Sequence, residues 1–132
     1  MIRELTSMET RRAIRPAVLI VEDDPLIRWS GAETLEDAGF EVLEAGSAAE
    51  ALALLESHGR VRVLFTDVDM PGQMDGLALA RVAAQRWPYM HIIVASGRRE
   101  PQPRRMPENG RFVAKPYAPE QIARDIDAWL AA

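Results

Sequence analysis

The sequence predicts an α/β fold in which a doubly wound, five-stranded parallel sheet carries helices on both faces. Three observations lead to this prediction. Short continuous apolar runs, typical of strands buried on both faces, recur along the chain. Segments with apolar residues at helical spacing, bounded by capping residues, separate these runs. The alternation of strand and helix implies βαβ crossovers, which build parallel sheets covered on both sides.

The first two strands are predicted at residues 17–21 and 40–45, with the sequences AVLIV and FEVLEA. Between them, Asp24 is expected to be the N-cap of a helix and Pro25 its first residue, because proline needs no N–H partner there. Gly39 is expected to stop this helix.

The second helix is predicted between Ser47 and Gly59. Ser47 is the expected N-cap, and Glu50 three residues later completes a capping box. The third strand, VRVLFT at residues 61–66, leads directly into Asp67 at its carboxyl end.

The rest of the chain continues the alternation, with a helix from about Leu77 to Trp87, strands at 91–96 and 111–114, and a final helix from Pro119 to Leu130. Five strands ordered in this way fit the flavodoxin-like class of doubly wound sheets. In such sheets the site lies beyond the carboxyl ends of the strands, near the point where the strand order reverses.

Residues 97–110 interrupt the pattern, because Pro101, Pro103 and Pro107 stand too close together for a regular helix to run through them. The fourth helix of the fold is therefore expected to be short, distorted or replaced by a loop. The segment is also basic, and two interpretations stay open: a surface that docks a partner, or a solvated loop.

Composition excludes several classes of protein. Hydrophobic residues make up 48% and charged residues 27% of the chain, ordinary values for a globular domain. The absence of cysteine excludes disulfide frameworks, thiolate zinc sites and cysteine nucleophiles. No apolar run approaches the ~20 residues that cross a bilayer, and the N-terminus lacks the apolar stretch of a secretory signal. We therefore expect a cytoplasmic protein without a membrane segment.

The net charge of -4 is unevenly distributed. Residues 1–16 carry +2, show no clear period, and are expected to form a flexible N-terminal extension. Residues 17–132, the expected folded domain, carry the remaining -6. Such a domain lacks the basic face that supplies most of the affinity for nucleic acids, so direct nucleic-acid binding is not expected.

Polar residues gather at the predicted carboxyl edge of the sheet. They follow or end four of the five strands, and they are Glu22, Asp23, Asp24, Asp67, Ser96 and Lys115. Asp24 is expected to cap a helix rather than to bind metal. Each of the others alone has an ordinary explanation at the start of a loop, but their convergence at one edge indicates a site.

The residue types at this edge define the chemistry. Neighbouring carboxylates repel one another unless a cation neutralises them, and oxygen ligands without histidine or cysteine favour Mg²⁺. A carboxylate beside such an ion can attack phosphorus. The ion, the Lys115 ammonium and the Ser96 hydroxyl can each stabilise one phosphoryl oxygen. These residues therefore predict phosphorylation of Asp67, with no general base required.

Five segments carry a resemblance to a known family: VLIVEDD (18–24), FTDVDMPG (65–72), DG (75–76), IIVASG (92–97) and FVAKPY (112–117). No single segment is decisive, but their order and spacing together are specific. The chain resembles the receiver domains of two-component response regulators, the phosphoacceptor family that includes the chemotaxis receiver. The resemblance covers residues 17–131 and implies a phosphorelay signalling domain that is not an enzyme, apart from promoting its own phosphorylation and dephosphorylation.

The resemblance implies a role for each acid. Asp67 matches the phosphoacceptor, and Asp23 matches the acid that binds Mg²⁺ directly. Glu22 matches the acid that acts on the ion mainly through water. Asp69, two residues after the acceptor, would offer its backbone carbonyl to the same ion.

The resemblance also implies roles at the fourth and fifth strands. Ser96 matches the switch hydroxyl, Lys115 the phosphate-binding lysine and Pro116 the cis-peptide position. Phe112, three residues before Lys115, matches the aromatic switch position. Phe112 also fits a core position of the last strand, and the two interpretations are compatible because a switch ring alternates between buried and exposed states.

The chain departs from the family pattern in three places. The loop at residues 71–76 is one residue longer than the commonest form, which would reshape the metal-side rim. Asp69 and Arg98 occupy positions that tune dephosphorylation in the family, so the lifetime of the phosphorylated state stays open. Residues 97–110 replace a helix that commonly forms the signalling or dimer face, so the usual dimer geometry is not expected to transfer, and a homodimer stays open.

The leading hypothesis is a single-domain response regulator, since no residues remain for an effector domain after the final helix. A histidine kinase or phosphotransfer protein would donate the phosphoryl group in a Mg²⁺-dependent reaction, switching a surface for an unknown downstream protein. One alternative is a phosphorylation-independent adaptor with the same fold. Another is a haloacid-dehalogenase-like phosphatase, suggested by Asp67 and Asp69, although in that family the DxD motif follows the first strand.

Overall fold

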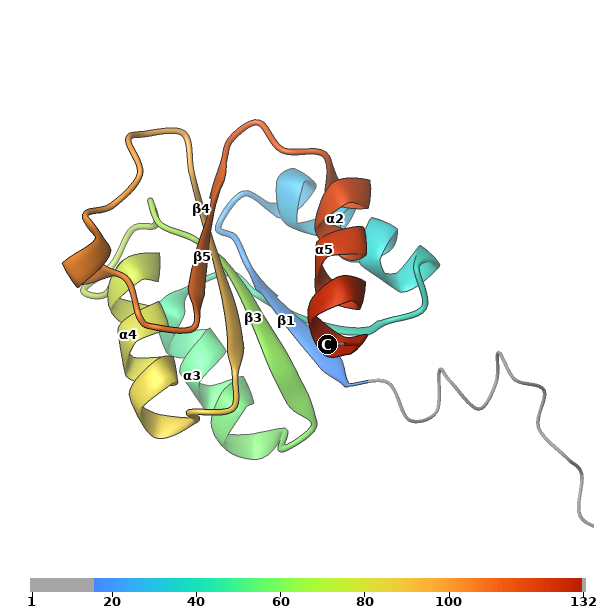
Figure 1. Ribbon diagram of the computed structural model, residues 1–132, viewed down its shortest axis with the longest axis horizontal. Helices are drawn as coiled ribbons and strands as arrows, with labels where there is room; N and C mark the ends of the chain where they lie inside the picture. Colours follow the sequence, from blue (N-terminus) through green and yellow to red (C-terminus); the bar gives the residue numbers. More distant parts are fainter. Residues whose placement is uncertain (1–15, 132) are drawn as a thin grey trace, which may run out of the picture.

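The structure is a computed structural model that describes residues 16–131, so the expected extension lies outside the described residues apart from Pro16. Strands and helices alternate along the chain (Figure 1). The strands are β1 Ala17–Val21, β2 Glu41–Ala45, β3 Val61–Asp67, β4 His91–Ser96 and β5 Gly110–Ala114. The helices are α2 Pro25–Asp37, α3 Ala48–Ser57, α4 Gly76–Arg86 and α5 Pro119–Ala131. Each of these elements lies within about two residues of the range that the sequence predicts.

The five strands form one parallel sheet in the order β2-β1-β3-β4-β5. The order reverses between β1 and β3, which confirms the doubly wound, flavodoxin-like fold. Helices α2 and α5 cover one face, and α3 and α4 cover the other (Figure 1). All the strands run the same way, so their carboxyl ends lie together at the upper edge in Figure 1.

Two apolar cores lie on either side of the sheet, because neighbouring residues of a strand point to opposite faces. Leu19, Leu64 and Ile92 are 0% exposed and pack with α3 and α4. Val18 and Ile93, also 0% exposed, pack with α2 and α5. Burial on both faces explains why these strands are continuous apolar runs rather than alternating ones.

The crossover from β4 to β5 contains no regular helix, as the three prolines predict. Its one helical element is η1, a 3-10 turn at Pro103–Arg105. Past this turn, Met106 packs against the core beside α4. The Asn109 side-chain amide donates a hydrogen bond to the Pro88 carbonyl at 2.9 Å. The crossover is therefore irregular, but its second half is attached to the domain.

The helix starts follow the expected capping chemistry. The Asp24 carboxylate accepts two N–H groups in the first turn of α2, at 2.9 and 3.3 Å, which confirms this residue as a cap. Ser47 Oγ accepts the N–H of Glu50 at 3.2 Å. The second half of the expected capping box is different. The Glu50 carboxylate accepts the N–H of Gly46, at 2.7 Å, because its side chain is long enough to reach one residue beyond the cap.

Among the described residues, none of the helices combines the length and the apolar character that spanning a bilayer requires.

Candidate functional site

Three carboxylates meet where β1 and β3 end. Glu22 and Asp23 follow β1, Asp67 ends β3, and one oxygen of each lies within 4.8 Å of the others. The two strands are neighbours in the sheet, so their carboxyl ends lie side by side. Glu22 and Asp67 are buried, whereas Asp23 is exposed. The expected acidic pair is therefore adjacent to Asp67, while Asp24 caps its helix instead.

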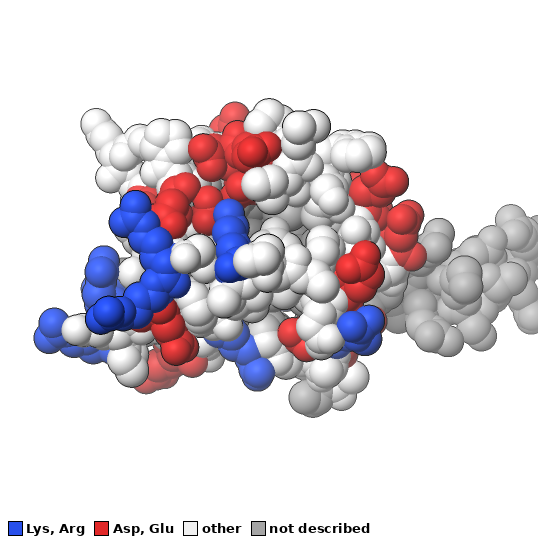
Figure 2. All heavy atoms as spheres, turned by 90° about the horizontal axis from the view of Figure 1, so that it is seen from above, with Lys and Arg blue, Asp and Glu red and all other residues white. Residues whose placement is uncertain are grey.

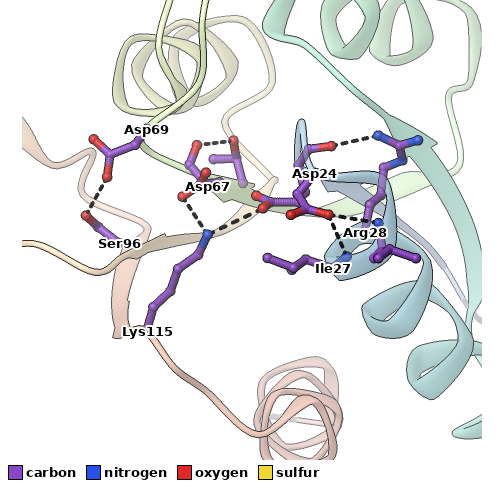
Figure 3. A network of polar contacts seen from close by, with 10 residues as sticks. Asp24, Ile27, Arg28, Asp67, Asp69, Ser96 and Lys115 are labelled. Atoms are coloured by element: carbon purple, nitrogen blue, oxygen red, sulfur yellow. Dashed lines mark hydrogen bonds and ion pairs between the residues drawn. The ribbon is translucent and has the colours of Figure 1, made fainter.

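Lys115 extends from the end of β5 to the buried carboxylates (Figure 3). Its Nζ lies 3.0 Å from Asp67 Oδ1 and 3.5 Å from Glu22 Oε1. Burial by itself lowers the pKa of Lys115, but contact with Asp67 and the charges of both carboxylates outweigh burial and raise that pKa. Lys115 is also the only lysine of the sequence, which otherwise uses arginine for its permanently charged basic residues. Its compact ammonium acts as a point charge, unlike a planar guanidinium.

One lysine does not neutralise three acids. Burial, followed by the charge of Asp67 and a hydrogen bond with it, raises the pKa of Glu22 to about 7, although Lys115 opposes this effect. Asp67 Oδ1 is buried, and its ion pair with Lys115 lacks the alignment of a hydrogen bond. The cluster therefore holds excess negative charge and an incompletely satisfied oxygen. Such an all-oxygen donor set fits Mg²⁺, which binds through one or two carboxylates and keeps several waters.

Gly76 allows α4 to begin directly against Asp67. A Cβ at position 76 would overlap the Asp67 carbonyl oxygen and would lie 2.9 Å from Thr66 Oγ1. Thr66 Oγ1 itself donates a hydrogen bond to that carbonyl at 2.9 Å. The Gly76 N–H donates to the Val68 carbonyl, also at 2.9 Å. These contacts place the end of β3, and with it the Asp67 side chain.

Ser96 lies at the same edge, but its hydroxyl is directed to Asp69 rather than to Asp67 (Figure 3). Ser96 Oγ donates to Asp69 Oδ2 at 3.1 Å and accepts the Arg98 N–H at 3.0 Å. Arg98 Nε lies 3.6 Å from Asp69 Oδ1. The hydroxyl must therefore leave Asp69 before it can reach a group attached to Asp67.

The structure also places the other two residues that the resemblance singles out. The peptide bond between Lys115 and Pro116 is cis, as expected. Phe112 is partly buried in β5, opposite Val94 of β4. Its role as a switch stays a prediction, as does the role of the Asp69 carbonyl.

Figure 2 views the edge where the strands end, with a group of acidic side chains in the upper middle of the view. Basic side chains gather on the side where the β4–β5 crossover lies in Figure 1. The crossover contributes four exposed arginines: Arg98, Arg99, Arg104 and Arg105. On the opposite side of Lys115, an open pocket is lined mainly by apolar residues, among them Leu26, Ile27 and Tyr117. Asp67 therefore lies between an arginine-rich segment and an apolar pocket.

Two residues that matter for the geometry were missed by sequence reasoning. Gly76 was noted only within the DG motif, and its close approach to Asp67 has no local sequence signal. Arg28 makes contacts with Glu22 and with Glu44 of β2. The partner in β2 lies 16 residues away along the chain, so helical periodicity could not reveal the pair.

The raised pKa of Glu22 predicts a pH-dependent stability of the metal-free protein. The folded-state pKa, about 7, lies above the ordinary 4.5, so the folded state holds the proton more tightly. The stabilisation from this group is complete below pH 4.5 and is lost as the pH rises through about 7. We expect the thermal unfolding temperature in a metal chelator to fall over this window. The fall should be smaller in Glu22→Gln, whereas the exposed control Asp37→Asn should follow the wild type; identical profiles for all three proteins would contradict the assignment.

Comparison with known proteins shows which family this chain is similar to. A family model described as the response regulator receiver domain matches residues 18–127. The sensor kinase CckA of Brucella abortus is 35% identical over 117 residues, which cover 86% of this chain and 12% of that protein. The C4-dicarboxylate transport transcriptional regulatory protein DctD of Rhizobium meliloti is 37% identical over 112 residues, which cover 83% of this chain and 24% of that protein.

A solved structure, the receiver domain of the hybrid histidine kinase CckA, is similar in fold and sequence. It superimposes with a TM-score of 0.74 at 30% identity, over 86% of this chain and 98% of that one. The chain thus spans a small part of the two full-length relatives but nearly the whole of this excised receiver domain.

Proposed function

This chain belongs to the response regulator receiver domain family of two-component systems, and on that premise we propose that Asp67 accepts a phosphoryl group from a phosphorylated histidine. The observation that carries the proposal is the position of Lys115 Nζ, 3.0 Å from Asp67 Oδ1 inside a cluster of three acids. A purely structural ion pair would not require two further carboxylates beside Asp67.

The proposed transfer exchanges one bond to phosphorus and requires the movement of few protein groups. An Asp67 carboxylate oxygen forms a bond to phosphorus while the P–N bond of the donor breaks. The electron pair of that bond goes to the imidazole, which leaves neutral because its other nitrogen carries a proton. Lys115 donates a hydrogen bond to one phosphoryl oxygen, and Ser96 donates to another once its hydroxyl has left Asp69.

Receiver domains generally bind Mg²⁺ in an acidic pocket, and the acids of this chain fit that ion. We propose that Asp23 and Asp67 bind it directly, Glu22 through water and Asp69 through its backbone carbonyl. When bound, the ion supplies positive charge that offsets the negative phosphoryl oxygens. The excess charge expressed in the raised pKa of Glu22 supports this assignment.

The proposed output is a change of surface rather than turnover of a substrate. Movement of Ser96 toward the phosphoryl group would break its contacts with Asp69, in the loop after β3, and with Arg98, at the start of the β4–β5 crossover. Phe112, in the neighbouring strand, would change its exposure at the same time. We propose that a downstream protein binds the changed surface. We also propose that residues 17–132 form the signalling domain and that residues 1–16 are an extension before it.

The test is incubation with acetyl phosphate and Mg²⁺, followed by intact mass measurement. The wild type is expected to gain one phosphoryl group, and Asp67→Asn is expected to gain none. Asp69→Asn is the matched control, because it removes a carboxylate two residues away and should still be labelled. The reagent can also acetylate lysine, but the chain has a single lysine side chain, and an added acetyl group differs in mass from an added phosphoryl group.

No mass gain in the wild type, or equal labelling of Asp67→Asn, would refute the proposed function. Omission of Mg²⁺ with a chelator present should suppress labelling. The same readout applied to a panel of purified, phosphorylated histidine kinases and phosphotransfer proteins would then identify the donor.

A further inference from the structure

Arg28 lies beside the acidic loop at residues 22–24, on the side away from Lys115 (Figure 3). Arg28 is part of α2, and its Nη1 donates a hydrogen bond to the backbone carbonyl of Glu22 at 2.8 Å. Its Nε forms an ion pair with Glu44 Oε1 of β2 at 3.3 Å. One side chain thereby connects the start of α2, the loop after β1 and the neighbouring strand β2.

This connection completes the backbone contacts of Glu22. The Glu22 N–H donates to the Ala45 carbonyl at 3.0 Å, and the Glu22 carbonyl accepts from Arg28. The loop between β1 and α2 is only three residues long, from Glu22 to Asp24. Holding the Glu22 peptide therefore also sets where the chain presents Asp23, the exposed acid of the cluster.

Neighbouring residues confine the Arg28 side chain. Only 24% of its side chain is exposed, so most of the side chain is removed from solvent. A Cβ at Gly46 would lie 3.2 Å from Arg28 Nη1, so a larger residue there would crowd the guanidinium. Glu50 accepts the Gly46 N–H at 2.7 Å and holds that glycine in place. A rigid guanidinium fork suits such a two-acceptor arrangement.

We propose that Arg28 is a positioning residue of the Mg²⁺ site, acting through the Glu22 carbonyl. This inference rests on the proposed function, because it concerns the same acidic cluster. The charge of Arg28 works in the opposite direction, since a nearby cation repels Mg²⁺ and weakens its binding. Glu44 offsets that charge in part. The positioning role therefore predicts weaker Mg²⁺ binding when Arg28 is removed, whereas the charge alone predicts tighter binding. This difference makes the inference testable.

The experiment is titration calorimetry of Mg²⁺ into the full chain, without a phosphodonor. Arg28→Ala is expected to weaken Mg²⁺ binding roughly 10- to 100-fold, the range for partners that orient metal ligands. Arg28→Lys is expected to weaken it as well, because an ammonium cannot span both acceptors in the guanidinium geometry. Arg86→Ala is the matched control: it removes the same charge from an ion pair with Glu56 on α3 and should bind as the wild type does, or slightly tighter.

Each outcome is decisive. Weaker binding by Arg28→Ala with unchanged or tighter binding by Arg86→Ala supports the inference. Wild-type or tighter binding by Arg28→Ala overturns it and leaves the proposed function standing. Absence of Mg²⁺ binding in the wild type refutes the proposed function, and the inference with it. Thermal unfolding without Mg²⁺ checks that each variant is folded, and if Arg28→Ala is not, wild-type affinity in Arg28→Lys overturns the inference.

Discussion

Gly76→Ala is expected to destabilise the domain by about 3 kcal/mol or more, at the upper end of overpacking effects. The added methyl group would overlap the carbonyl oxygen of Asp67, which is backbone and cannot rotate away as a side chain could. Either α4 or the end of β3 must move. Thermal unfolding should show a fall in the midpoint on the order of 10 °C. Labelling by acetyl phosphate should fall with it, because the displaced backbone carries Asp67.

Gly59→Ala provides the matched control for this prediction. A Cβ at Gly59 would meet nothing within 4 Å, so the same substitution should change stability by no more than about 0.5 kcal/mol. If Gly76→Ala proved as stable as Gly59→Ala, the close approach of α4 to Asp67 would not be a requirement of the fold.

Lys115→Ala is expected to lower the rate of phosphorylation by acetyl phosphate roughly 10²- to 10³-fold, the usual effect of removing one donor that stabilises a transition state. The lysine contacts Asp67 and Glu22 at 3.0 and 3.5 Å, and no second lysine exists in the sequence to replace it. Single-turnover labelling at saturating Mg²⁺, read by intact mass, measures the effect.

Measuring the affinity of Lys115→Ala for Mg²⁺ shows whether its lower rate comes from the missing lysine or from weaker binding of the ion. Removing a positive charge from the cluster should leave Mg²⁺ binding as tight as in the wild type or tighter, so a slow variant that still binds Mg²⁺ points to the lysine itself. Arg86→Ala, which breaks an exposed ion pair, should retain the wild-type rate. A Lys115→Ala rate within a few-fold of wild type would show that Lys115 does not stabilise the transferred group.

Local signals in the sequence were sufficient for the framework. Continuous apolar runs predicted buried strands, and capping residues such as Asp24 and Ser47 located the helix starts, because these effects act within a few residues along the chain. Three closely spaced prolines predicted that no regular helix would run through the β4–β5 crossover, since a proline in a helix interior removes a hydrogen bond of the helix. The parallel topology then placed the polar strand ends at one edge, which brought Asp67 and Lys115 together.

Side-chain orientations, and contacts that do not follow from the strand ends, were decided by the tertiary structure alone. The direction of the Ser96 hydroxyl depends on Asp69, 27 residues away, and the contact of Arg28 with Glu44 depends on the pairing of β1 with β2. The raised pKa of Glu22 depends on how deeply the fold buries it beside Asp67. The sequence by itself determined which groups stand at the site, because strand order carries them there. Only packing decided their orientation and charge balance, because these depend on distance and burial in three dimensions rather than on spacing along the chain.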